Sequence, residues 1–245
     1  MDRAPTASEL LDAWEHGRFQ PPVARARLLL ALAVPAASPE DLDRFGIGRR
    51  DQELLDFRER VFGPRMAGVA QCPACAQEVE LDFPVTDVRA RAAIDAVEPQ
   101  TLRFDGYDLR FRLPTCDDLA AVAALGDPPG RRAGLLRRCV TEARRGGEAA
   151  PAESLPDAVA AALSARMSEL DPQGDIRLDL RCPECAGRWQ APLDVASYLW
   201  SEIHSWAERM LRDVHTLAAA YGWREADILT MGPSRRQAYL ELIRQ

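Results

Sequence analysis

The chain has 245 residues, of which 47% are hydrophobic and 28% are charged, and this is enough for one sizeable domain or two small ones. Its 38 acidic residues outnumber its 31 basic ones and give a formal net charge of −7, which speaks against a general nucleic-acid-binding protein because that class needs a positive surface. No apolar stretch approaches the roughly 20 residues that a membrane span needs, so we expect no membrane insertion.

Residues 1–70 are predicted to form an N-terminal helical region. Ser38, followed by Pro39 and two acidic residues, is a typical helix start, with serine as the N-cap and proline in the first turn. Between Gly48 and Phe62, apolar residues recur at helical spacing. The helices expected in this region span residues 8–16 (capped by Ser8), 22 to about 34, 39 onward, and about 49–62.

Residues 71–194 are predicted to be a mixed α/β region. Apolar and polar residues alternate on both sides of Asp105-Gly106, which predicts a β-hairpin. Thr115 or Asp117 can then cap a helix. Residues 144–151 carry the weakest pattern and are expected to be the least ordered part of the chain. The other elements expected here are helices over 115–125, 131–143 and 156–170, and a strand over 176–181.

Four of the six cysteines fall in two Cys-Pro-x-Cys motifs, and these four are Cys72, Cys75, Cys182 and Cys185. A proline inside each pair favours a turn that points both sulfurs the same way, and strand-like alternation flanks both pairs. The pattern predicts the two half-knuckles of a split zinc ribbon. Four thiolates complete a tetrahedral Zn²⁺ site and leave no open position, so we expect one structural zinc per chain that joins its N- and C-terminal halves.

Other interpretations of these cysteines stay open. A structural disulfide is disfavoured because the chain begins without the charged-then-apolar layout of a secretory signal, which also predicts a cytoplasmic location. A redox-active pair normally opens a helix, whereas strands are expected here, and unpaired thiols are a further alternative. The 110 positions from Cys72 to Cys182 are a long gap for a zinc finger, so two half-sites on separate chains also remain open.

Residues 195–245 carry the clearest helical signal. Apolar residues recur at steps of four and three from Leu199 to Tyr221, and Gly222 is the predicted stop. Trp206 and Tyr221 lie on this apolar stripe and are expected in the core, whereas Trp200 is a candidate for a partner surface. Shorter helices over 223–230 and 234–244 complete a C-terminal helical bundle. The fold class expected overall is α+β and helix-dominated, with a small β layer.

Three segments of this tail resemble a known family. They are His215-Thr216-Leu217-Ala218, Tyr221 to Leu229, and Arg235 to Leu240. Together they resemble the T-even type phage baseplate proteins, also described as baseplate hub assembly chaperones, with relatives in contractile injection systems. The resemblance is dense over about residues 195–245 and weaker elsewhere.

The resemblance implies a structural component or assembly chaperone of a baseplate, with baseplate or hub proteins as partners and no catalytic residues. Such a protein is cytoplasmic and could be incorporated into a phage-tail-like particle. We expect the tail to bind its partner through aromatic and basic side chains, which are Trp200, Trp223, Arg235, Arg236 and Tyr239.

No pattern in the chain indicates an enzyme or a small-molecule substrate: a phosphate-binding loop, a nucleophile elbow and a zinc-protease helix are all lacking. His204 and His215 share a helix face, but about 16 Å apart at 1.5 Å per residue, which no single metal ion spans. The alternative function is a zinc-ribbon nucleic-acid-binding or regulatory adaptor that uses the arginines of residues 131–145. A solvated helix face paired with nearby acids is the simpler interpretation of that run.

Overall fold

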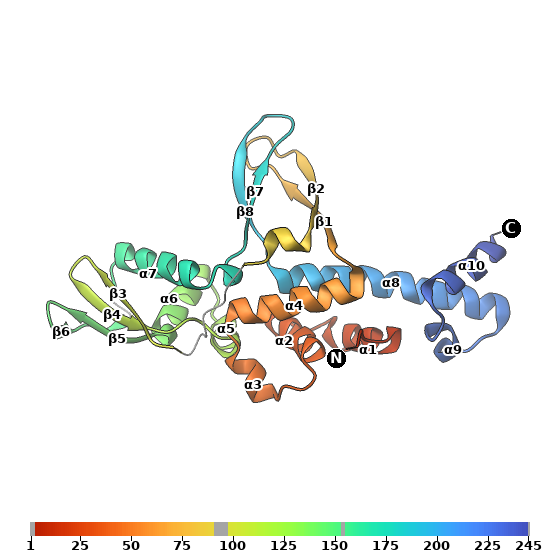
Figure 1. Cartoon of the computed structure of the whole chain (residues 1–245), viewed down its shortest axis with the longest axis horizontal. Helices are drawn as coiled ribbons and strands as arrows, with labels where there is room; N and C mark the ends of the chain where they lie inside the picture. The colour runs from red at the N-terminus through yellow and green to blue at the C-terminus, as the bar shows by residue number, and fades with distance from the viewer. Residues whose placement is uncertain (1–2, 91–97, 153–154, 245) are drawn as a thin grey trace.

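Small antiparallel sheets accompany a predominantly helical chain, which confirms the predicted helix-dominated α+β class. The computed structural model describes residues 3–90, 98–152 and 155–244. Figure 1 shows a central body of helices, a lobe at one end that combines helices with a sheet, a pair of β-hairpins projecting from the side, and a helical hook at the C-terminus. Within the described ranges, no helix is both long and apolar enough to cross a membrane.

The central body is built by helices from both ends of the chain. They are α1 (Ala7–Gly17), α2 (Pro22–Ala33), α3 (Pro39–Arg44), α4 (Ile47–Phe62) and the first half of α8 (Val195–Tyr221). Local signals set their starts: Ser38 accepts a hydrogen bond from the Asp41 N–H, as predicted, and Thr6 rather than Ser8 caps the first helix in a capping box with Glu9. Leu29, Leu54 and Leu199 are fully buried where α2, α4 and α8 meet.

The lobe combines one sheet with three helices. The sheet has the order β3 (Gln100–Phe104), β4 (Tyr107–Phe111), β5 (Val140–Arg145) and β6 (Glu148–Ala149), and the helices are α5 (Cys116–Ala123), α6 (Pro128–Cys139) and α7 (Asp157–Leu170). The predicted hairpin is confirmed, with Asp105 and Gly106 in the left-handed region at its turn. Phe111 and Leu163 are fully buried in a second core that belongs to this lobe.

One part of the lobe differs from the sequence prediction. The helix expected over 131–143 ends at Cys139, and residues 140–149, expected to be helical and then weakly ordered, form a second hairpin. Gly146 and Gly147 supply its turn, with φ angles of 59° and 91°. The strand β5 pairs with β4, about thirty residues earlier in the chain. The hydrogen bonds that make these residues a strand are therefore long-range, and the local sequence pattern does not indicate them.

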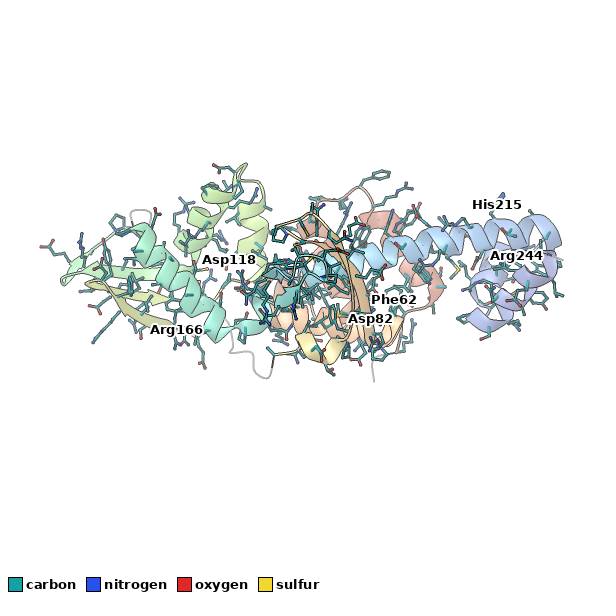
Figure 2. The ribbon with its side chains drawn as sticks, turned by 90° about the horizontal axis from the view of Figure 1, so that it is seen from above. Phe62, Asp82, Asp118, Arg166, His215 and Arg244 are labelled. Atoms are coloured by element: carbon teal, nitrogen blue, oxygen red, sulfur yellow. The ribbon has the colours of Figure 1, made fainter. Side chains whose placement is uncertain are left out.

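The C-terminal hook follows the long helix α8. Gly222 ends that helix in the left-handed conformation, as predicted, and α9 (Glu225–Leu229) and α10 (Pro233–Ile243) then fold back on its last turns. Val214, Leu217, Ile228 and Leu240 form a small third core. In the view of Figure 2, His215 and Arg244 lie at one end of the molecule and Arg166 of the lobe lies at the other.

Candidate metal centre and C-terminal hook

Two β-hairpins carry the cysteine motifs. One is formed by β1 (Arg65–Gln71) and β2 (Glu78–Pro84), followed by the short 3-10 helix η1 (Val85–Val88), and the other by β7 (Arg177–Arg181) and β8 (Arg188–Pro192), preceded by η3 (Pro172–Gly174). The strand β1 was not expected, because residues 1–70 were predicted to be helical. Its small residues carry no strong period of their own, and its strand conformation comes from pairing with β2.

Both cysteine turns have the same backbone geometry. In the first, the Cys72 N–H donates to the Gln77 carbonyl at 2.9 Å and the Ala76 N–H donates to the Cys72 carbonyl at 2.9 Å. In the second, the Cys182 N–H donates to the Gly187 carbonyl at 2.9 Å, and the residue equivalent to Ala76 is Ala186. These two alanines hold φ angles of 60° and 58°, a region that side chains other than glycine rarely adopt. Because both turns adopt the same rarely populated backbone conformation, we infer that they have the same role.

The four cysteine sulfurs meet where the tips of the hairpins come together. The Sγ atoms of Cys72 and Cys185 are 3.7 Å apart, those of Cys75 and Cys182 are 3.6 Å apart, and all four lie within 4.8 Å of one another. Four sulfurs about 2.3 Å from a central zinc ion would be ~3.8 Å apart. The cluster therefore has the size of a tetrahedral metal site, and the predicted pairing of the two motifs within one chain is confirmed.

Burial divides the four cysteines of the cluster into two kinds. Cys72 and Cys182 are buried, whereas Cys75 and Cys185 are exposed. Burial disfavours the Cys72 thiolate, but the backbone N–H groups of Ala74 and Cys75, together with hydrogen bonds from the Cys185 and Cys75 side chains, outweigh it and bring the pKa of Cys72 down to about 7. The Gln77 N–H favours the Cys75 thiolate, but the hydrogen bond with Cys185 and the other sulfurs raise the pKa of Cys75 to about 12. A bound cation would relieve this crowding of negative charge and allow all four thiolates.

The base of the hairpin pair is tied to the central body. The Tyr198 hydroxyl, on α8, donates to the Ala67 carbonyl at 2.9 Å and accepts from the Ala67 N–H at 3.0 Å. Arg58 on α4 and Glu202 on α8 form an ion pair at 2.7 Å close by. No strand of one hairpin packs extensively on the other in the part of the chain that the structure describes. The cysteine cluster is therefore the principal joint between the hairpins above their base.

Two of the predicted partner-binding residues are buried. Trp200 is only 7% exposed, and its ring packs over Gly17, which corrects the expectation of a partner surface. The N-terminal half of α8 is covered on several sides by α1, α2 and α4, so residues off the main stripe are also enclosed. Arg236 is also buried, in an ion pair with Asp213 at 3.2 Å, and holds the hook together.

The other three predicted residues lie together on the hook. Trp223 and Tyr239 are half-buried and make an edge-on contact with ring centroids 4.8 Å apart, and Arg235 is exposed. Tyr221, which was expected in the core, is 39% exposed and stacks on Trp223 at 4.5 Å. The sequence contained a sign of this position. Tyr221 comes directly before the predicted helix stop at Gly222, so it lies at the end of the apolar stripe, where the chain turns and the next segment can bring Trp223 against its ring. Tyr221, Trp223, Tyr239 and Arg235 are called the hook surface below.

Most of the remaining polar candidates have contacts within the chain. His204 accepts a hydrogen bond from the Trp14 indole N–H at 2.8 Å, and both His204 and His215 are exposed. Of the arginines in residues 131–145, Arg138 binds the carboxylates of Asp117 and Asp118. Three others also have partners: Arg131 donates to backbone carbonyls, Arg144 pairs with Glu142, and Arg145 lies over the Tyr107 ring. Cys139 is a buried core residue and Cys116 packs against the central core.

The chain matches none of the protein-family models, curated proteins or solved structures with which it was compared. The resemblance of the tail to baseplate proteins therefore stays a prediction.

Proposed function

We propose that this chain is a non-enzymatic structural component or assembly chaperone of the baseplate of a contractile phage tail or of a related contractile injection system. The observation that carries the proposal is the tail signature, whose three segments fold into the hook. The hook has its own small core and extends beyond the central body (Figure 1), so its surface is open to a partner on several sides.

The composition of the hook supports partner binding. The hook surface combines three aromatic rings with the exposed Arg235, and aromatic and arginine side chains are enriched at the centres of protein interfaces. Leu242, beside it on α10, is 57% exposed, and Leu211 of α8 is 39% exposed. Apolar side chains left open in this way are suited to burial against another protein.

The metal in the proposal is Zn²⁺, one per chain, in a structural role. Four thiolates are soft ligands that suit zinc, and four protein ligands leave no position for water or substrate. The ion would clamp the hairpin tips and hold residues 72–75 against residues 182–185. The central body, from which the hook extends, would thereby gain a link between the two halves of the chain.

The adaptor alternative has weaker support. The arginines of residues 131–145 that it would use are largely engaged with partners inside the lobe, and the net charge of the chain is −7. Nucleic-acid binding through such a surface would depend steeply on salt. Failure to bind DNA or RNA at low salt would remove this alternative.

The proposed function is tested by mass spectrometry on a tagged copy expressed in its native host, with sedimented contractile particles compared with the soluble fraction. Stoichiometric presence in particles makes the protein a structural component. Absence from particles, with baseplate proteins co-purifying from the soluble fraction, makes it an assembly chaperone. Recovery of baseplate proteins in neither fraction overturns the proposal.

The hook is tested in the same experiment with matched variants. Arg235→Ala and Tyr239→Ala should reduce the recovery of baseplate proteins by about tenfold, as truncation of interface anchors commonly does. Arg166→Ala removes the same charge from the opposite end of the molecule and should leave recovery unchanged. Equal recovery with Arg235→Ala and Arg166→Ala would show that the hook surface is not the binding site.

A further inference from the structure

A cleft of about 410 Å³ lies at the seam between the central body and the lobe. Its walls come from α2, α4 and the start of α8 on one side and from α5, α6 and α7 on the other, together with the segments around η3 and β8. The walls are largely apolar, through Val23, Leu113, Leu119, Met167, Ile176 and Leu193. The cleft opens to solvent along the seam and is distinct from both the cysteine cluster and the hook.

The polar groups of the cleft carry an excess of negative charge. The lining includes one arginine, Arg50, and four aspartates, which are Asp51, Asp171, Asp175 and Asp194. Arg50 forms an ion pair with Asp51, with a nitrogen–oxygen distance of 2.7 Å, and Asp175 forms one with Arg177 at 3.2 Å. Neither of the other two aspartates forms an ion pair among the residues that the structure describes, and the only positive charge that acts on them is Arg50, which already pairs with Asp51.

The two unpaired aspartates differ in their surroundings. Asp194 is exposed at the rim, where it caps α8 through the N–H and hydroxyl of Ser197. Asp171 is 7% exposed; one of its carboxylate oxygens accepts the Gly48 N–H, and the other is buried without a hydrogen-bond donor in the described chain. A buried carboxylate oxygen without a donor is costly, and a cation in the neighbouring cleft would reduce that cost.

The carboxylates are not arranged as a metal site. In the described ranges, only the four cysteines bring three or more candidate ligand atoms together. The aspartates are spread over the floor and the rim instead, which suits an extended ligand with an apolar stem and a positive end. The side chains of arginine and lysine have this form, because a hydrocarbon stem carries the charged group.

We propose that this cleft binds a basic side chain, flanked by apolar residues, of a partner polypeptide. Charge complementarity argues for a cationic group, and the apolar walls argue for the hydrocarbon stem and its apolar neighbours. The volume and the open seam fit a short segment of chain rather than an enclosed small molecule, which a pocket normally covers on most sides. The inference does not rest on the proposed function, since it uses neither the hook nor the metal.

The test uses the full-length protein and the peptide acetyl-Leu-Arg-Leu-amide as the probe, with binding followed by amide chemical shifts in NMR. Shifts should concentrate on the amides that line the cleft, such as those of Gly174 and Ser197. The same peptide with citrulline in place of arginine is isosteric and neutral, and it should bind about tenfold more weakly or worse. Equal binding of the two peptides would overturn the proposal.

Protein variants provide a second comparison. Asp194→Asn removes a charge from the rim but keeps a good helix cap, so the fold should be preserved and the affinity for the arginine peptide should fall about tenfold. Asp82→Asn removes the same charge from the first cysteine hairpin, outside the cleft, and should change nothing. The proposal fails if Asp194→Asn binds like the unmodified protein, if the arginine peptide does not bind at millimolar concentration, or if n-butylammonium alone binds as tightly as the peptide.

Discussion

The backbone N–H of Gly48 donates a 2.8 Å hydrogen bond to the carboxylate of Asp171, which lies 123 residues later in the chain. This contact joins the start of α4, in the central body, to the end of α7, in the lobe. Nearby, the Ile47 N–H donates to the Pro114 carbonyl and the Cys116 N–H donates to the Phe45 carbonyl. The two parts of the molecule are therefore connected by directed backbone hydrogen bonds as well as by apolar packing.

The first prediction follows from this joint. A Cβ atom on Gly48 would lie 1.7 Å from Oδ1 of Asp171, so the carboxylate must move and release the Gly48 N–H. Gly48→Ala should therefore lower the free energy of unfolding by about 1–3 kcal/mol, although alanine is the better helix former. Urea denaturation measures the change. Gly126→Ala, where a Cβ meets open space, is the control, and an equal effect of both variants would contradict the argument.

The second prediction concerns the metal. Purified protein should carry about one zinc ion per chain, measured by inductively coupled plasma mass spectrometry. Cys182→Ser should lose the ion and unfold at a lower urea concentration, because metal binding is coupled to folding and the sulfurs are the principal joint between the hairpin tips. Cys116→Ser, a cysteine outside the cluster, should retain the ion. Metal-free protein of unchanged stability would exclude a structural zinc.

The third prediction separates two tryptophans of the tail. Trp200 is buried in the central core, so Trp200→Ala should cost about 3–5 kcal/mol in unfolding free energy. Trp223 is half-buried on the hook surface, so Trp223→Ala should cost clearly less while reducing partner recovery. Thermal unfolding by circular dichroism compares the two. A larger loss of stability for Trp223→Ala would mean that the hook, not the body, limits the stability of the chain.

The fourth prediction is a pH dependence at Asp51. Burial, opposed by Arg50 and supported by the charges of Asp194 and Asp171, raises the pKa of Asp51 to about 6, from 3.8 for an unperturbed aspartate. Because the folded value exceeds the unfolded one, the stability contributed by this group is complete below pH 3.8 and is lost as the pH rises through about 6. The Asp51→Asn variant lacks this pH-dependent contribution to stability, because asparagine does not titrate.

The measurement is the difference in unfolding free energy between Asp51→Asn and the unmodified protein at several pH values. As the pH rises from 5 to 7.5, the variant should gain about 1–1.5 kcal/mol relative to the unmodified protein. Loss of the partner of Arg50 lowers the variant's stability at every pH and does not alter this trend. Protonation of the cysteines affects both proteins alike. If the difference in unfolding free energy stays constant with pH, burial does not raise the pKa of Asp51.

Much of the fold was predictable because its signals are local. The caps at Ser38 and Thr115, the stop at Gly222 and the hairpin turn at Asp105-Gly106 each depend on residues within a few positions. The strand β5 was not predictable in this way, because its partner strand β4 lies far away in the sequence and its own residues favour no single conformation.

The sequence by itself determined that four cysteines form two matched turns, since a Cys-Pro-x-Cys motif between short strands constrains only its own backbone. Only the tertiary structure decided that the four sulfurs meet within one chain, that Trp200 faces the core, and that Asp171 lies beside the seam. The physical reason is the same for all three. The surroundings of a side chain depend on which distant elements pack against it. The 3.6-residue period of a helix indicates which residues share a face, but not which elements cover that face.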